Sequence, residues 1–151
     1  MEGEEASVEM TSVSVKGCER HGLFVDSGAS VKATQCEFSE NGVSGVYVRG
    51  GSKGIFTDCL FHHNGDDGVL AEDDSTEDTL VELRGEQTEI HHNKDCGVLA
   101  FTNTTINIYI PSRPITALVH DNKNDLYTSD GAKIQSQLSS SSLELTVIHP
   151  Q

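Results

Sequence analysis

Residues 59–71, CLFHHNGDDGVLA, hold the side chains of this sequence that are best suited to chemistry. His62, His63, Asp66 and Asp67 lie within six consecutive positions, on either side of Asn64. Imidazoles and carboxylates ligate zinc, and a pair of carboxylates can act as general acid and base on a glycosidic bond. Which chemistry is open to these side chains depends on the elements that position them.

The same stretch is one copy of an internal repeat. Residues 36–48, CEFSENGVSGVYV, and residues 88–100, TEIHHNKDCGVLA, align with it, and fainter copies lie at residues 13–25 and 117–128. The asparagine recurs at positions 41, 64, 93 and 122, that is, after 23, 29 and 29 residues, and Cys18 takes its place in the first copy. A period of this size is typical of stacked supersecondary units.

Short strands explain the pattern inside each copy better than helices do. Apolar residues alternate with period two in segments such as Val46-x-Val48 and Val69-x-Ala71, and no segment has a helical apolar stripe. About three short strands per period form one rung of a right-handed parallel β-helix, in which each strand pairs with its equivalent on the next rung. We therefore expect an all-β fold, a single-stranded right-handed parallel β-helix of about five to six rungs.

The expected organisation is one β-helix with short flanking segments. Residues 1–9 form an acidic lead, residues 10–128 hold the repeats, and residues 129–151 form a last partial rung or a capping tail. The extra residues of the two longer repeats are expected as loops near residues 72–78 and 110–115. Only 35% of the residues are hydrophobic and Trp is absent, which suits a thin core that repeats along one axis.

Stacking gives each repeated position a role. Two inward apolar columns are expected, one of Val15, Phe38, Phe61, Ile90 and Val119 and the other of Leu23, Val46, Val69 and Val98. The asparagines are expected to stack at a turn as an amide ladder of Asn41, Asn64, Asn93 and Asn122. The glycines that follow should supply the φ freedom needed to leave that turn, and these are Gly22, Gly45, Gly68 and Gly97.

Stacking also gathers histidines and acidic residues of successive rungs at one corner. One interpretation is a solvated turn, where outward positions take polar residues. Another is a zinc site in the outward column of His62, His91 and His120, because imidazoles one rung apart can converge on a metal. Residues 72–78 are acidic enough for calcium but lack the spacing of a calcium loop. We expect no cofactor, with zinc or calcium as alternatives.

The repeat resembles that of a known superfamily. CEFSENGVSGVYV is similar to the N-x-[IF]-x-x-N-x-x-x-G-[IV]-x-[VL] repeat of right-handed β-helix, or pectin-lyase-like, proteins, with Cys36 and Cys59 at the first asparagine position. The resemblance covers roughly residues 10–128. The resemblance implies the fold but does not select an activity, because the superfamily contains polysaccharide-active enzymes as well as non-catalytic interaction modules.

A second resemblance concerns the paired aspartates. Residues 65–71, GDDGVLA, resemble the G-D-D-C-[IV] segment of polygalacturonase-type glycoside hydrolases, which implies that Asp66 and Asp67 act as general acid and base. The N-T-D, G-H-G and R-x-K segments of those enzymes do not occur in this sequence. The likeness therefore rests on the two aspartates alone.

Charge and composition limit the partners. Ten Lys and Arg residues against 24 Asp and Glu residues give a formal charge of −14, which repels nucleic acids and anionic membrane surfaces. The acidic start has no features of a signal peptide and no apolar run could span a membrane, so a cytoplasmic location is expected. The four cysteines lack the spacing of a zinc site and are expected to be buried and reduced.

Flat stacked sheets suit a long ligand. We therefore expect a non-catalytic β-helix repeat module that binds an extended ligand, either a polysaccharide or a protein partner. Aromatic residues expected near the surface are few, namely Tyr47, Phe56 and Phe101, which weakens the case for stacking on sugars. The alternative is a polysaccharide-active enzyme, a hydrolase or lyase, that uses Asp66 and Asp67.

Overall fold

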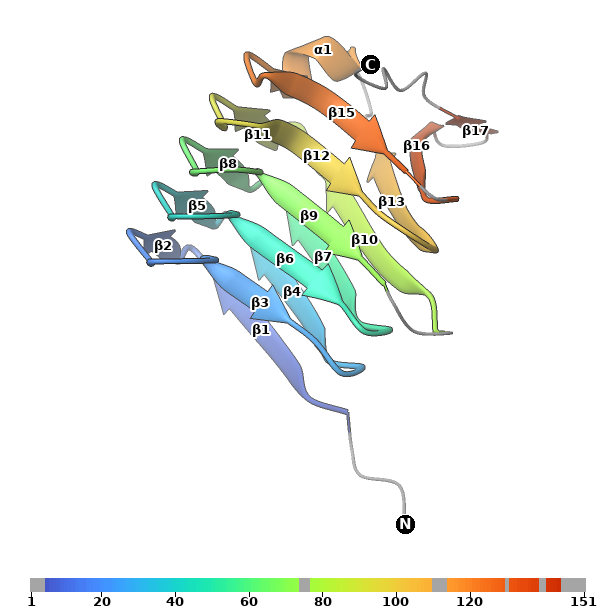
Figure 1. The fold of residues 1–151 in the computed structure, drawn as a ribbon, viewed down its shortest axis with the longest axis horizontal. Helices are drawn as coiled ribbons and strands as arrows, with labels where there is room; N and C mark the ends of the chain where they lie inside the picture. Colours follow the sequence, from blue (N-terminus) through green and yellow to red (C-terminus); the bar gives the residue numbers. More distant parts are fainter. Residues whose placement is uncertain (1–4, 74–76, 110–113, 130, 139–140, 145–151) are drawn as a thin grey trace.

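The computed structural model describes residues 5–73, 77–109, 114–129, 131–138 and 141–144, and within them it is almost entirely β-structure. Three sheets run along the molecule (Figure 1). The first sheet contains, in spatial order, β1 (Ser7–Thr11), β4 (Ser30–Thr34), β7 (Lys53–Thr57), β10 (Thr79–Arg84), β13 (Thr104–Tyr109), β16 (Lys133–Leu138) and β17 (Ser141–Glu144).

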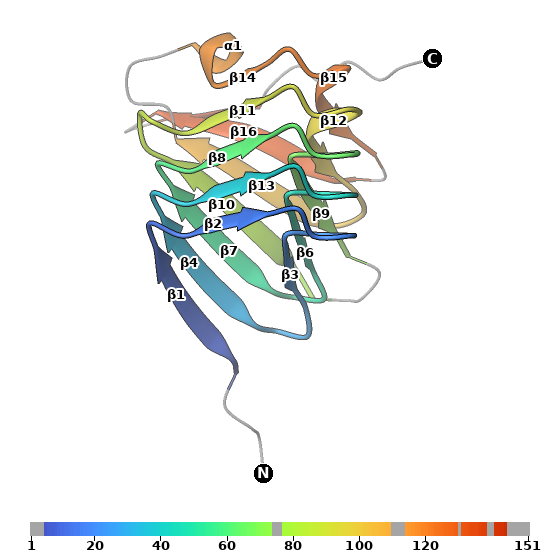
Figure 2. The ribbon, with the colours of Figure 1, turned by 90° about the vertical axis from the view of Figure 1, so that its left-hand side faces the viewer.

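The other two sheets have five strands each. The second sheet contains β2 (Ser14–Lys16), β5 (Glu37–Ser39), β8 (Leu60–His62), β11 (Glu89–His91) and β14 (Val119–His120). The third sheet contains β3 (Leu23–Val25), β6 (Val46–Arg49), β9 (Val69–Glu72), β12 (Cys96–Ala100) and β15 (Asn124–Thr128). Figure 2 shows the second sheet from its outer side, with the other two behind it.

Each turn of the chain adds one strand to each sheet, so that β1, β2 and β3 are followed by β4, β5 and β6 in the same order. All of these neighbouring strands pair in parallel, and only β17 is antiparallel to its neighbour β16. The result is a parallel β-solenoid of about five turns. The expected all-β architecture of stacked rungs is confirmed.

The core lies between the three sheets, and the two expected inward columns line it. Phe38 and Phe61 are fully buried and stack with ring centroids 5.3 Å apart. Phe56 is also fully buried and packs edge-on against both rings. The expectation that Phe56 lies near the surface is therefore wrong. It pairs with Ala33 and Leu83 in an inward column of the first sheet, and Gly54 in the same strand leaves room for its ring.

The longer repeats differ from the shorter one where expected. Glu72 ends β9 and Thr79 begins β10, and of the segment between them residues 74–76 lie outside the described residues. The second insertion follows β13, where residues 110–113 lie outside the described residues and a single helical turn, α1 (Ile115–Leu118), buries Leu118 at the end of the stack. Sequence periodicity gave no sign of this turn.

The ends of the described chain are also strands. β1 begins at Ser7, inside the segment expected as an acidic lead. In the segment expected as a partial rung or cap, β16 extends the first sheet in parallel and β17 turns back on it, whereas residues 145–151 lie outside the described residues. The four cysteines are free thiols. Among the described residues, no helix has the length and apolar character needed to cross a membrane.

Candidate functional site

An asparagine ladder forms the corner between the second and third sheets. Asn41 Nδ2 donates to Asn64 Oδ1 at 3.1 Å, Asn64 Nδ2 to Asn93 Oδ1 at 2.9 Å, and Asn93 Nδ2 to Asn122 Oδ1 at 2.9 Å. The same carboxamide oxygens accept the backbone N–H of the preceding asparagine. The side-chain oxygens of Asn64, Asn93 and Asn122 thus each accept two donors from the previous turn, and the ladder fixes the backbone at this corner.

The glycines after the ladder have a different role from the expected one. Gly22, Gly45, Gly68 and Gly97 do not have positive φ angles; the positive angles lie at the position before each asparagine, in Glu40, His63, His92 and Asp121. A Cβ on Gly68 would lie 2.8 Å from Asn93 Nδ2 and 2.8 Å from the Gly97 carbonyl oxygen. Close approach of the ladder and the next backbone explains these glycines, and the expected reason, φ freedom, is wrong.

Histidines form two parallel stacks outside the ladder. The rings of His62 and His91 stack with centroids 5.1 Å apart and planes 2° apart, and His120 continues the stack at 5.4 Å. Beside them, His63 and His92 stack at 5.1 Å.

Stacked rings of this kind lie alongside one another. The ring nitrogens that lie close together belong instead to residues adjacent in sequence. The Nδ1–Nδ1 distance is 2.8 Å for His62 and His63 and 2.7 Å for His91 and His92. Zinc binding by His62, His91 and His120 stays a prediction. Among the described residues, the group of three or more ligand-type atoms close enough for one ion lies elsewhere.

Carboxylates flank the histidine stack at both ends. His62 Nε2 lies 2.8 Å from Glu37, and this hydrogen bond lowers the pKa of the Glu37 carboxyl. His120 contacts Asp121 at 2.8 Å and Glu89 at 2.7 Å, and hydrogen bonds to these two carboxylates raise the pKa of His120. His91, in the middle of the stack, has its pKa lowered by burial.

The structure separates the two aspartates of the predicted catalytic pair. Asp66 is exposed, whereas Asp67 is buried and its carboxylate accepts the backbone N–H of Cys96 at 3.1 Å. Burial raises the pKa of Asp67 to about 6, and the nearby charges of Asp95 and Asp66 act in the same direction. The assignment of Asp66 and Asp67 as acid and base stays a prediction, and the two carboxylates occupy different environments.

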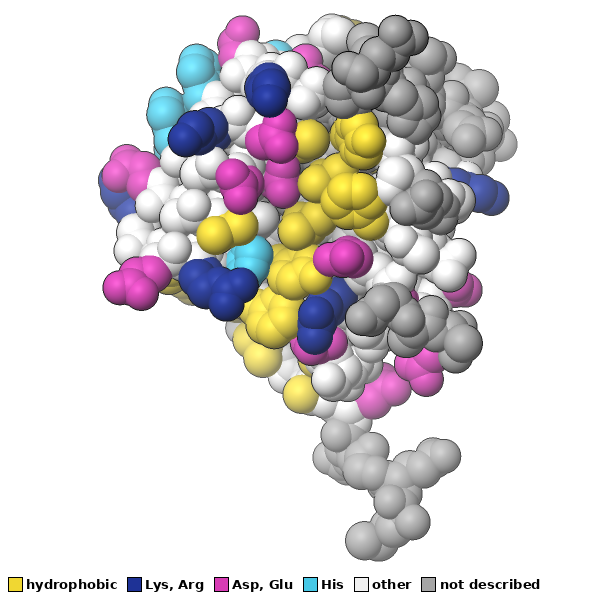
Figure 3. All heavy atoms as spheres, in the orientation of Figure 1, with side chains coloured by type: hydrophobic (Ala, Val, Ile, Leu, Met, Phe, Trp, Pro, Cys, Tyr) yellow, Lys and Arg dark blue, Asp and Glu magenta, His cyan; other side chains and the backbone are white. Residues whose placement is uncertain are grey.

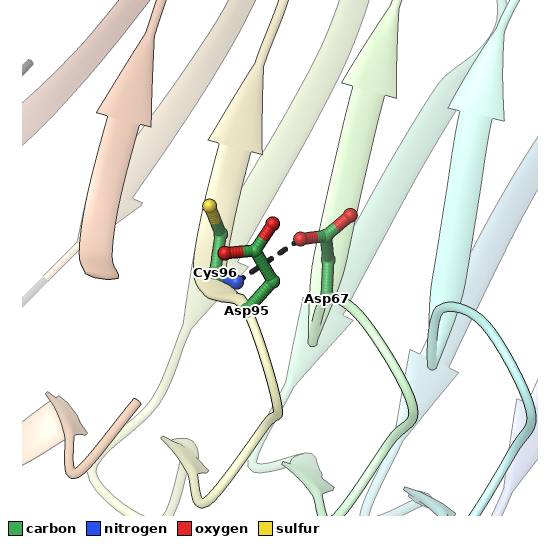
Figure 4. A group of neighbouring side chains, drawn as sticks. All are labelled: Asp67, Asp95 and Cys96. Atoms are coloured by element: carbon green, nitrogen blue, oxygen red, sulfur yellow. Dashed lines mark hydrogen bonds between the residues drawn. The ribbon is translucent and has the colours of Figure 1, made fainter. Parts of the chain in front are cut away.

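Asp67 instead belongs to a cluster with Asp95 and Cys96 at the start of β9 and β12 (Figure 4). One oxygen of each carboxylate and the thiol sulfur all lie within 4.8 Å of one another. Burial, reinforced by the two carboxylates, raises the pKa of the Cys96 thiol to about 12. Asp95 is half-buried and also contacts Asn124 Nδ2 at 3.3 Å and Lys123 Nζ at 3.8 Å.

An apolar column runs along the outer side of the third sheet (Figure 3). It consists of the outward residue of each strand, in register from turn to turn: Phe24, Tyr47, Leu70, Leu99 and Tyr127. Phe24 is 51% exposed, Leu70 and Tyr127 are half-buried, and Tyr47 and Leu99 are 9% and 8% exposed. Rungs about 4.8 Å apart make this column about 19 Å long.

A shallow hollow lies at each end of the apolar column. The first, of about 440 Å³, is lined by Arg20, His21, Phe24, Tyr47 and Arg49. The second, of about 330 Å³, is lined by Asp95, Cys96, Leu99, Phe101, Lys123, Asn124 and Tyr127. Arg49 lies 5.5 Å from the Phe24 ring and pairs with Asp26 at 3.2 Å, so its cation is already partly neutralised.

Sequence reasoning missed most of the apolar column. Of its members, only Tyr47 was singled out as a surface aromatic residue. The signal was present in the middle letter of each third-sheet triplet, LFV, VYV, VLA, VLA and LYT, which is apolar in every copy. An outward strand position that never takes a polar residue indicates a surface with a function beyond solvation.

Comparison with known proteins agrees with this architecture. A family model described as right handed beta helix region matches residues 1–136. Neither the search of curated proteins nor the search of solved structures gives a match. The match spans most of the chain, and the strands it covers stack as the family description requires. The chain belongs to the right-handed β-helix family.

Proposed function

We propose that this β-helix is a non-catalytic module that binds an extended, basic segment of a partner protein along the apolar column. The observation that carries the proposal is the unbroken register of five outward apolar residues across the third sheet. The β-solenoid needs nothing apolar at these positions, because its core lies on the opposite side of the same strands. A surface of this kind is typical of an interaction site.

The dimensions fit a short extended segment. A column about 19 Å long matches about six residues of extended chain at about 3.3 Å per residue. The hollows at the two ends would hold side chains at the ends of such a segment. Little rearrangement is required, since the three strands beneath the middle of the column, β6, β9 and β12, are fixed by pairing on both sides.

The contacts that the aromatic rings of the column already make favour a protein ligand over a polysaccharide. Phe24 and Tyr47 stack on each other at 5.1 Å, and Arg49 covers Phe24, so these ring faces are already in contact with protein groups. The middle of the column is aliphatic, with Leu70 and Leu99. Aliphatic side chains match apolar side chains of a partner better than they match a sugar ring.

Charge favours a basic partner. The formal charge of −14 attracts a positively charged segment and opposes the approach of a second copy of this chain. Carboxylates also lie next to the column: Glu72 accepts a hydrogen bond from the Tyr47 hydroxyl at 2.6 Å, and Asp95 lines the second hollow. A non-catalytic role is further supported by the burial of Asp67, whose side chain is 5% exposed and whose carboxylate accepts the backbone N–H of Cys96.

The proposal can be tested with peptides of defined pattern. Fluorescence anisotropy would compare labelled octapeptides of alternating Lys-Leu, Lys-Ser and Glu-Leu, with an oligogalacturonate as the carbohydrate probe. We expect the Lys-Leu peptide to bind at least about tenfold more tightly than the other three, which corresponds to about 1.4 kcal/mol. Equal binding of Lys-Leu and Lys-Ser would contradict the role of the apolar column, and cleavage of the oligogalacturonate would favour an enzyme.

A matched pair of double variants locates the contact. Phe24→Ser with Leu70→Ser removes an exposed and a half-buried member of the column, and we expect it to weaken Lys-Leu binding at least about tenfold. Val8→Ser with Ile55→Ser removes residues of similar exposure from the first sheet and should leave binding unchanged. Equal losses in the two variants would overturn the assignment to the third sheet.

A further inference from the structure

A second site lies where β9 and β12 begin, and it does not depend on the proposed partner. We propose that Asp67, Asp95 and Cys96 bind a zinc-like divalent transition metal. Their ligand atoms lie within 4.8 Å of one another (Figure 4). Three atoms 4.8 Å apart lie about 2.8 Å from their common centre, and oxygen and sulfur ligands bind zinc at about 2.0–2.3 Å, so a closure of at most about 0.5–0.8 Å per ligand would let all three reach one ion.

The β-solenoid holds these side chains together. Gly68 N donates to the Cys96 carbonyl and Asp95 N to the Asp66 carbonyl, which places Asp67 and Cys96 at equivalent positions on adjacent turns. The hydrogen bond from Cys96 N to Asp67 Oδ1 fixes the carboxylate beside the thiol. Asn124 occupies the position of Cys96 one turn further, and Asp125, which follows it, accepts from Asn122, so it does not join the cluster.

A second observation points to a ligand beside the cluster. Gly45 N donates to the Asp67 carbonyl, and one turn earlier Gly22 N donates to the Ser44 carbonyl in the same way. Ser44 therefore occupies, on the preceding turn, the position equivalent to Asp67. Equivalent positions on adjacent turns direct their side chains the same way, so Ser44 lies next to Asp67. Its side chain is fully buried, and Oγ has no hydrogen-bond partner among the described residues. A buried hydroxyl is almost always hydrogen-bonded, and a water on the metal would supply the partner.

The ligand set selects the metal. A thiolate with two carboxylates suits zinc or cobalt, whereas calcium and magnesium take oxygen ligands alone. Three protein ligands leave a fourth position for water, as in open zinc sites. Asp95 and Cys96 also line the second hollow, which gives an ion a route from solvent. A cation at this place would offset the repulsion between two carboxylates that share a partly buried site.

Cobalt gives a direct readout. The reduced protein would be titrated with CoCl2 while the near-ultraviolet absorption that arises from cobalt–thiolate bonding is followed. We expect a saturable band that Zn²⁺ abolishes, that is absent in Cys96→Ser, and that needs at least about tenfold more Co²⁺ in Asp95→Asn. Cys18→Ser and Asp66→Asn are the matched controls, since they remove a thiol and a neighbouring carboxylate outside the cluster, and both should keep the band.

Asp95→Asn is also expected to fold normally, because Asp95 is half-buried and asparagine has a side chain of the same size. Zn²⁺ should raise the Tm of the wild type and of Asp66→Asn, and the rise should be smaller in Asp95→Asn. No cobalt band in the folded wild type would overturn the proposal, and so would an undiminished band in Cys96→Ser.

Discussion

Asn64 Nδ2 lies 2.9 Å from Asn93 Oδ1, although 29 residues separate the two asparagines in the chain. Both side chains are buried, and the contact repeats on the turns before and after. The ladder thus satisfies polar groups at the corner of every turn from Asn41 to Asn122, and it fixes the register of the strands on both sides.

Removing one rung of this ladder should destabilise the fold. In Asn64→Ala, the backbone and side-chain amides of Asn41 lose their acceptor, and the Phe38 carbonyl loses a donor. We expect a loss of at least about 2 kcal/mol in the free energy of unfolding, measured with urea. Gln87→Ala, at an exposed site, should stay within about 0.5 kcal/mol of the wild type. A similarly small change in Asn64→Ala would show that the ladder is dispensable.

Replacing a turn glycine that is closely approached by other atoms should destabilise the fold more than replacing a glycine that is needed only for its positive φ. In Gly68→Ala, the new methyl group would crowd Ile90, Asn93 and the Gly97 backbone, and we expect a loss of about 2–3 kcal/mol. Gly17 has a φ of +73° and open space around it, so Gly17→Ala should cost about 1 kcal/mol through φ alone. Urea unfolding of both variants checks the order, and a larger loss in Gly17→Ala would refute the close-approach explanation.

The sequence was enough to predict the stacked rungs because the repeat keeps its phase. The spacing of Asn41, Asn64 and Asn93, with an apolar residue three positions before each, specifies turns and inward columns together. Phe56 was misplaced because its strand lies outside the aligned segment, so no equivalent residue indicated its direction. Only the register with Ala33 and Leu83 shows that its ring points inward.

The candidate sites were harder to predict, for physical reasons that differ from site to site. Alignment of the repeats correctly predicted that His62 and His91 stack. Whether their ring nitrogens point toward one ion depends on the orientation of the rings, which the sequence does not specify. Asp67 and Cys96 fall in one column by alignment, yet whether the Asp95 carboxylate lies beside them depends on backbone geometry. The apolar column was visible in sequence and was missed because outward positions were assumed to be polar.

Asp67 gives a pH dependence of stability with a defined sign. Its folded-state pKa of about 6 lies above the ordinary value of 3.8, so the folded state binds this proton more tightly than the unfolded state. The contribution is fully present below about pH 4 and is lost as the pH rises through about 6. In EDTA at pH 7.5, Asp67→Asn should therefore be more stable than the wild type, by up to about 3 kcal/mol.

That advantage should disappear at pH 4, where Asp67 is protonated in the wild type. Urea unfolding at the two pH values measures it, and Asp66→Asn serves as the exposed neighbour, which should gain much less because burial of Asp67 is the larger cause of the shift. A less stable Asp67→Asn at pH 7.5 in EDTA would mean that burial does not disfavour the ionised carboxylate.

The histidines of the stack should titrate at different pH values, because their surroundings differ. Hydrogen bonds to Asp121 and Glu89 raise the pKa of His120, whereas burial lowers that of His91. In an NMR titration, His120 should therefore lose its proton at a higher pH than His91. Asp121→Asn should lower the pKa of His120, while Gln87→Ala should not change it. Coincident titration of His91 and His120 would contradict the contacts described for this corner.

Three half-buried leucines, one on each sheet, allow the most direct test of the proposed binding face. They are Leu80 on the first sheet, Leu60 on the second and Leu70 on the third. The protein would be labelled with ¹³C at its leucine methyl groups and titrated with the Lys-Leu octapeptide. Binding along the apolar column predicts that the methyl resonances of Leu70 and Leu99 shift while those of Leu60 and Leu80 stay in place. Equal shifts at Leu60 or Leu80, or none at Leu70, would contradict it.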